Sequence, residues 1–158
     1  MPNGVTATLL GGLVAGALDI IYICLHVFFV YRSPPTRVWQ SVAAGLLGRD
    51  AAVGGGLPTA LLGLGLHFFI AIVMAGVFVA AAARLKVLTL YPWITGPIYG
   101  IGLYLVMQLI VLPLSATRGG GANFDVTNQF FWGAIVAHTM LVGLPIALIA
   151  RHFSVQAP

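Results

Sequence analysis

Charged residues are what this 158-residue sequence has least of. Asp, Glu, Lys and Arg together make up 6% of it, whereas soluble domains carry roughly 25%. Hydrophobic residues account for 60%. This balance excludes an ordinary soluble domain and predicts an integral membrane protein.

Cysteine and acidic residues are also scarce. Cys24 is the single cysteine, which excludes a disulfide within the sequence and argues against a thiolate metal cluster. The net charge of +4 comes from basic residues spread over short loops, where membrane proteins normally carry Lys and Arg. We therefore expect the lipid bilayer as a partner, with a second copy of the chain or another membrane protein as further candidates, and no nucleic acid.

Long apolar runs are what the sequence does have. Each run has the roughly 20 residues that a helix needs to cross ~30 Å of hydrocarbon. None alternates as barrel strands do, and inside lipid every backbone polar group needs an internal partner. The sequence therefore predicts an all-α membrane protein, a single domain over residues 1–158 built as a four-transmembrane-helix bundle. The predicted spans cover about residues 5–30, 57–83, 93–114 and 130–150.

The segment between the first two runs, "SPPTRVWQSVAAGLLGRDAAVGGG", predicts a short interfacial helix over about 35–47. Pro35 suits the first turn of a helix, Gly48 ends it, and residues 54–56 form a glycine hinge. One face of this helix carries the apolar residues Val38, Trp39, Val42, Ala43 and Leu46. We favour a structural cap over the bundle, with lipid or partner sensing as the alternative.

An even number of spans puts both termini on one side, here called side A, and the interfacial helix on the other, side B. Positive charge does not decide the orientation, because side A has three basic residues and side B has four. Those of side A are Arg84, Lys86 and Arg151, and those of side B are Arg32, Arg37, Arg49 and Arg118. The last of these lies in "SATRGGGANFD", which predicts a hairpin connection.

Small residues predict where the helices touch. Gly12 and Gly16 in the first span, and Gly96 and Gly100 in the third, have the spacing that lets two helix backbones approach closely in a membrane. Spans two and four each carry a central histidine, which indicates two related helical hairpins. Prolines in the later spans predict local kinks; they are Pro97, Pro113 and Pro145.

A polar stripe runs along the first span. At about 100° per residue, Asp19, Tyr22 and His26 lie on the same face as the glycine pair. A carboxylate facing lipid costs several kcal/mol, so this face should turn toward other helices or a wet cavity. The expected partners on the other spans are His67, Tyr104, Gln108 and His138. Asp19 and the two histidines fall within ~5 Å of the bilayer centre, and the cluster extends toward side B.

Three chemical interpretations of this cluster stay open. Asp19, His67 and His138 form a protonation centre, since histidine titrates near neutral pH; or the histidines bind a metal or haem; or the cluster is a set of buried hydrogen bonds that fixes helix register. The metal or haem interpretation is the least favoured, because no helix offers paired ligands. We expect no cofactor, no metal and no catalytic residue.

The motifs "GLVAGALD", "GLHFFIAIVMAGVFVAAAA", "GPIYG", "MQLIVLPLSATR" and "GAIVAHTMLVGLPIALIARHF" together resemble the YagU-like family of small bacterial inner-membrane proteins. His67, His138, Pro113 and Arg151 match the family pattern, and Gln108 and Asp19 depart from it. The resemblance implies a bacterial inner-membrane protein with cytoplasmic termini and a link to acid tolerance.

Taken together, these features favour a proton-responsive small transporter or channel-like subunit. The alternative is a non-catalytic assembly subunit in which the polar cluster only fixes packing, and a haem- or metal-binding redox protein ranks third.

Overall fold

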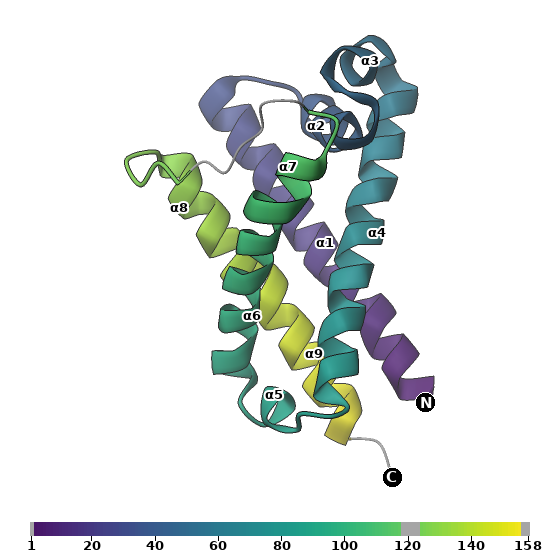
Figure 1. Cartoon of the computed structure of the whole chain (residues 1–158), viewed down its shortest axis with the longest axis vertical. Helices are drawn as coiled ribbons and strands as arrows, with labels where there is room; N and C mark the ends of the chain where they lie inside the picture. Colours follow the sequence, from purple (N-terminus) through teal and green to yellow (C-terminus); the bar gives the residue numbers. More distant parts are fainter. Residues whose placement is uncertain (1, 118–123, 156–158) are drawn as a thin grey trace.

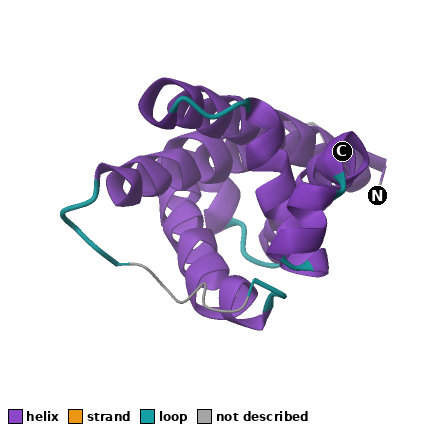
Figure 2. Ribbon diagram, turned by 90° about the horizontal axis from the view of Figure 1, so that it is seen from above, coloured by secondary structure: helices purple, strands orange, loops and turns teal. Residues whose placement is uncertain are grey.

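The computed structural model describes residues 2–117 and 124–155. No described residue lies in a strand, and short loops join the helices (Figure 2). The elements in chain order are α1 (Pro2–Tyr31), α2 (Pro35–Leu47), α3 (Arg49–Gly54), α4 (Gly56–Ala82), α5 (Val87–Leu90), α6 (Pro92–Val106), the π-helical η1 (Met107–Val111), α7 (Leu112–Leu114), α8 (Gln129–Val136), the π-helical η2 (Ala137–Gly143) and α9 (Leu144–Val155).

Four helical stretches are long and apolar enough to cross a membrane, which confirms the prediction of an all-α transmembrane bundle. Spans 1 and 2 lie in α1 and α4; span 3 comprises α6, η1 and α7; span 4 comprises α8, η2 and α9. Their bounds are Asn3–Tyr31, Gly56–Ala82, Pro92–Leu114 and Gln129–Ser154. Span 4 continues past its predicted end at residue 150 to Ser154, because the prediction followed the apolar run, which stops before Arg151, whereas the helix does not end there.

The two ends of the bundle differ (Figure 1). The start of α1 and the end of α9 lie at one end together with α5, which makes this end side A. Helices α2 and α3 lie at the other end, side B. The segment 118–123, which contains most of the predicted hairpin connection, lies outside the described residues.

Helix α2 has the predicted bounds. Of the apolar face, Val38 and Ala43 are buried, and Leu46 is 62% exposed. Gln40 is only 6% exposed, and its side chain donates from Nε2 to Gly56 O at 3.0 Å, at the turn where α3 meets α4. Apolar periodicity does not anticipate a carbonyl that needs a donor.

Glycine brings α1 and α4 into backbone contact. A Cβ atom built on Gly12 would lie 2.4 Å from the Cα of Ile72, and one on Gly16 would lie 2.9 Å from the ring of Phe68. Real side chains essentially never approach backbone atoms so closely. The glycine pair of the first span therefore lies at the interface between spans 1 and 2.

The same arrangement joins spans 3 and 4. A Cβ on Gly96 would lie 2.7 Å from the Cα of Leu144, and a Cβ on Gly100 would lie 2.1 Å from the carbonyl oxygen of His138. Span 4 contributes its own glycine to this contact, since a Cβ on Gly143 would lie 2.1 Å from Gly96 O. Both hairpins thus pack a histidine-bearing helix against a glycine pair.

Two π-helical turns come directly before prolines. Pro113 has no N–H to donate to the carbonyl four residues back, and its ring crowds that carbonyl; the affected carbonyl belongs to η1. Pro145 acts in the same way on η2. Leu112 N–H donates to Met107 O, and Leu144 N–H donates to Thr139 O, both five residues back. The wider turns accommodate the prolines within continuous spans.

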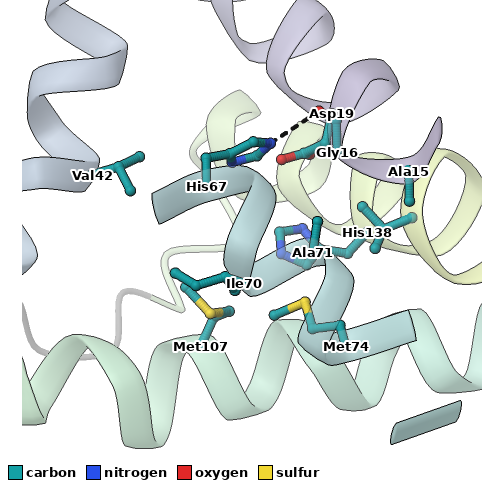
Figure 3. A pocket seen from close by; sticks show the side chains of 11 residues that line it. Ala15, Gly16, Asp19, Val42, His67, Ile70, Ala71, Met74, Met107 and His138 are labelled. Carbon is teal, nitrogen blue, oxygen red and sulfur yellow. Dashed lines mark hydrogen bonds between the residues drawn. The ribbon is translucent and has the colours of Figure 1, made fainter. Parts of the chain in front are cut away.

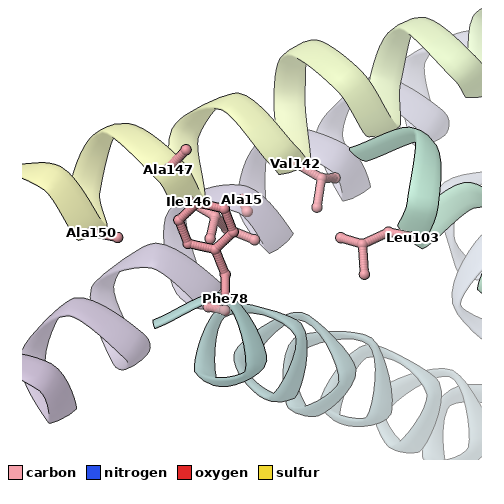
Figure 4. Close-up of a cluster of buried hydrophobic side chains, with 8 residues drawn as sticks. Ala15, Phe78, Leu103, Val142, Ile146, Ala147 and Ala150 are labelled. Atoms are coloured by element: carbon pink, nitrogen blue, oxygen red, sulfur yellow. The ribbon is translucent and has the colours of Figure 1, made fainter. Parts of the chain in front are cut away.

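The buried core lies at the level where all four spans meet and consists mostly of small side chains (Figure 4). Phe78 and Ile146 are its largest members, each 1% exposed. The other members are Ala15, Ala75, Leu103, Val142, Ala147 and Ala150. Alanine at half of the core positions keeps the helices close together, as expected where lipid provides no hydrophobic drive for association.

An apolar groove of about 480 Å³ separates α4 from α6. Its walls include Phe69 and Val73 of α4 and Val106 of α6, all of which are exposed. Toward side A the two helices are joined by Tyr99, whose hydroxyl donates to Met74 O at 2.7 Å.

Replacement of Gly100 by Ala should destabilise the bundle by about 1–3 kcal/mol, because the new methyl group would force α6 away from η2. Gly102→Ala is the matched control: it lies on the same helix, a Cβ there meets no atom within 4 Å, and alanine favours a helix by up to about 1 kcal/mol. Thermal unfolding in detergent should show a lowered Tm for the first variant only. Equal Tm values for the two variants would contradict the packing described here.

Candidate functional site

A carboxylate and two imidazoles from three different spans meet around adjoining cavities. Asp19 of α1, His67 of α4 and His138 of η2 line both a cavity of about 260 Å³ and a smaller one of about 100 Å³. All three side chains are half-buried. They point into the bundle and not toward lipid, as the energetics of polar groups in membranes requires.

His67 links α4 to α1. Its Nε2 lies 2.9 Å from the carbonyl oxygen of Gly16 (Figure 3). A carbonyl only accepts hydrogen bonds, so Nε2 must carry the proton. Gly16 permits this contact because it has no side chain to hold the helices apart. In the neutral ring, Nδ1 is then the nitrogen with the free lone pair.

His138 is oriented by its own helix and by span 3. Its Nδ1 lies 2.9 Å from Ala134 O, one turn earlier, so this nitrogen carries the proton and Nε2 has the lone pair. The ring packs edge-on against Tyr104, with centroids 5.6 Å apart. The Tyr104 hydroxyl in turn accepts a hydrogen bond from Gln108 Nε2 at 3.3 Å. Tyr104 and Gln108 line the larger cavity.

Asp19 and Tyr22 complete the polar lining on α1. Asp19 follows Gly16 by nearly one turn, which places its carboxylate beside the contact made by His67. Tyr22 reaches across to α8, where its hydroxyl oxygen would lie 2.5 Å from a Cβ on Gly133. The glycine at this position gives the hydroxyl room.

His26 lies apart from this cluster, although the sequence placed it in the same stripe. It does not line either cavity. Its ring packs against Tyr22, Tyr31 and Phe130, with centroids 5.6 to 6.2 Å apart. Its buried Nε2 has no hydrogen-bond partner among the described residues. His26 follows Asp19 by seven residues in α1, which places it ~10 Å closer to side B, within this aromatic group.

Helix α2 contributes residues that the sequence analysis left out of the site. Val38, Ser41 and Val42 line the larger cavity, so α2 stands between the polar cluster and side B. The Ser41 hydroxyl donates to Val38 O at 2.6 Å. The i, i+3, i+4 spacing of these residues was the signal that could have identified them.

The described residues contain no group of three or more His, Cys, Asp or Glu side chains arranged to hold a metal ion. The cluster consists of one carboxylate and two imidazoles, which are groups capable of exchanging protons. Each imidazole is held by one of its nitrogens, and its other nitrogen has the lone pair in the neutral ring.

Searches of protein families, of curated proteins and of solved structures found no match to the chain. The resemblance to the YagU-like family therefore stays a prediction.

The two histidines should adopt opposite neutral tautomers. We expect ¹⁵N NMR at a pH where both rings are neutral to show His67 protonated at Nε2 and His138 at Nδ1, because each of these nitrogens faces a carbonyl oxygen. The variants His67→Ala and His138→Ala assign the signals. The same tautomer at both sites would contradict the described contacts.

Proposed function

We propose that this chain is a proton-responsive membrane protein, a small transporter or a channel-like subunit, in which Asp19, His67 and His138 take up and release protons. The observation that carries the proposal is that these groups line the same cavity from three separate spans. Ionisable residues within spans are energetically expensive and characteristically mark ion or proton pathways.

Charge balance explains how protonation acts on this cavity. A carboxylate in the membrane is stable when it is neutral or lies beside a cation. Spans 1 to 3 contain no Lys or Arg, and Arg151 of span 4 lies near side A. His67 and His138 are therefore the groups that supply a positive charge near Asp19. Loss or gain of one proton changes the net charge of the cavity and the attraction between its walls.

The π-helical turns η1 and η2 are elements whose conformation can change in response to protonation of the cavity. His138 lies within η2, and Met107 and Gln108 lie within η1, so both wide turns line the cavity. Such turns occur frequently at functional sites. A shift of either turn along its span rotates these side chains relative to Asp19, which couples protonation to the shape of the cavity.

A structural role for the same residues is the second candidate. It is favoured by the hydrogen bond from His67 to Gly16, which ties α4 to α1 without any need for titration. In that case the chain is an assembly subunit that pairs with a second copy or with another membrane protein. Substitutions of Asp19 separate the two candidates.

Asp19→Asn keeps the shape of the side chain and removes its titration. In reconstituted vesicles carrying a pH-sensitive dye, we expect this variant to lose the pH-dependent response of the parent protein while its Tm stays near normal. Asp50→Asn is the matched control, because it removes an exposed carboxylate at side B. An unchanged pH response in Asp19→Asn, together with poor folding of Asp19→Leu, would favour the structural role.

We further propose that the chain resides in a bacterial inner membrane with side A in the cytoplasm, where it contributes to acid tolerance. This follows the resemblance to the YagU-like family, since the basic residues divide almost evenly between the two sides.

Labelling of single cysteines in a Cys24→Ala background tests this orientation. A membrane-impermeant maleimide should label Ala116→Cys, at side B, in intact cells. It should label Arg84→Cys, at side A, only after lysis; both positions are exposed. The reverse pattern would invert the assignment.

A further inference from the structure

A further cavity, separate from the two cavities that Asp19 lines, opens at side B and is lined by two arginines. Its volume is about 430 Å³, and Arg37 and Arg49 line it together with the hydroxyl-bearing residues Ser33, Ser41 and Thr117. The described residues that line it include no carboxylate. Two guanidinium groups facing one space repel each other, so this arrangement favours an anion between them.

The backbone around this cavity is fixed by specific contacts. The segment that carries Thr117 is tied to α2 by a hydrogen bond from Ala116 N–H to Gly45 O at 2.8 Å. The turn that leads to Arg49 uses Gly48 with φ +80°, a conformation that glycine adopts readily. Gln40 ties α2 to the start of α4. The arginines and hydroxyls are thus presented by a defined scaffold.

The cavity lies at the level of the lipid headgroups. Ser33 and Arg37 follow the end of span 1 at Tyr31, Arg49 comes shortly before the start of span 2 at Gly56, and Thr117 follows the end of span 3. Arginine forms paired hydrogen bonds with phosphate oxygens, so a lipid phosphate at this level matches the two guanidinium groups.

We propose that this cavity binds the phosphate group of an anionic membrane lipid, with Arg37 and Arg49 as the charged contacts and the Ser33 hydroxyl as an additional donor. The site is distinct from the Asp19 cluster and does not depend on the proposed proton response. Only Ser41 lines both this cavity and the larger cavity of the proton site.

Native mass spectrometry of the full chain in detergent, titrated with phosphatidylglycerol or phosphatidylcholine, tests this proposal. The chain should bind phosphatidylglycerol in preference. Arg37→Gln and Arg49→Gln should each weaken binding about fivefold, and the double variant about 25-fold, since one basic residue near anionic headgroups contributes roughly that factor. Replacement of both arginines by Lys should weaken binding less, because the charge remains and the paired hydrogen bonds are lost.

The matched control is the double variant Arg84→Gln and Lys86→Gln, which removes the same charge from exposed positions at side A. It should leave phosphatidylglycerol binding unchanged. An equal loss in this control would overturn the proposal by showing that net charge alone attracts the lipid. Displacement of the lipid by excess inorganic phosphate would also overturn it, by assigning the cavity to a soluble anion. If the lipid complex persists in excess phosphate, the result supports a lipid, and not a soluble anion, as the source of the phosphate group in this cavity.

Discussion

Close approach of helix backbones at glycine is the constraint on which this bundle depends. Lipid tails are as apolar as leucine, so helices in a membrane gain little from hiding apolar surface and must gain from tight packing instead. Gly12 and Gly16 permit it between spans 1 and 2, and Gly96 and Gly100 permit it between spans 3 and 4. The same contacts position the polar groups, because His67 reaches a glycine carbonyl and the backbone of His138 lies against a glycine.

The positions of the polar side chains therefore follow from helix packing as well as from their own hydrogen bonds. Each histidine has one nitrogen held by a backbone carbonyl, on another helix for His67 and on its own helix for His138. These bonds set the direction of each ring and determine which of its nitrogens carries the proton in the neutral form. The prolines that follow η1 and η2 widen the turns carrying Gln108 and His138. Backbone geometry, and not a dedicated loop, shapes this cavity.

The four spans could be predicted from the sequence because bilayer thickness dictates their length. The glycine contacts and the inward placement of Asp19, His67 and His138 could be predicted because small residues let helices approach in a membrane and polar groups are costly toward lipid. The exclusion of His26 could not, since it depends on how far the aromatic group around Phe130 extends into the bundle. The burial of Gln40 depends on a carbonyl at a helix junction. The contribution of Ser41 to the cavity depends on where α2 docks. Periodicity describes one helix at a time and carries no information on these tertiary relations.

The groove between α4 and α6 adjoins the polar cluster. Its lining exposes no polar atoms, and Ile70, Met74 and Met107 line both the groove and the smaller of the two cavities at Asp19. In a bilayer, hydrocarbon chains would occupy such a space, because an empty one forfeits dispersion contacts along its whole lining. These three side chains would then pack against lipid on one side and line the cavity on the other, so that the fluidity of the bilayer would bear on the shape of the cavity.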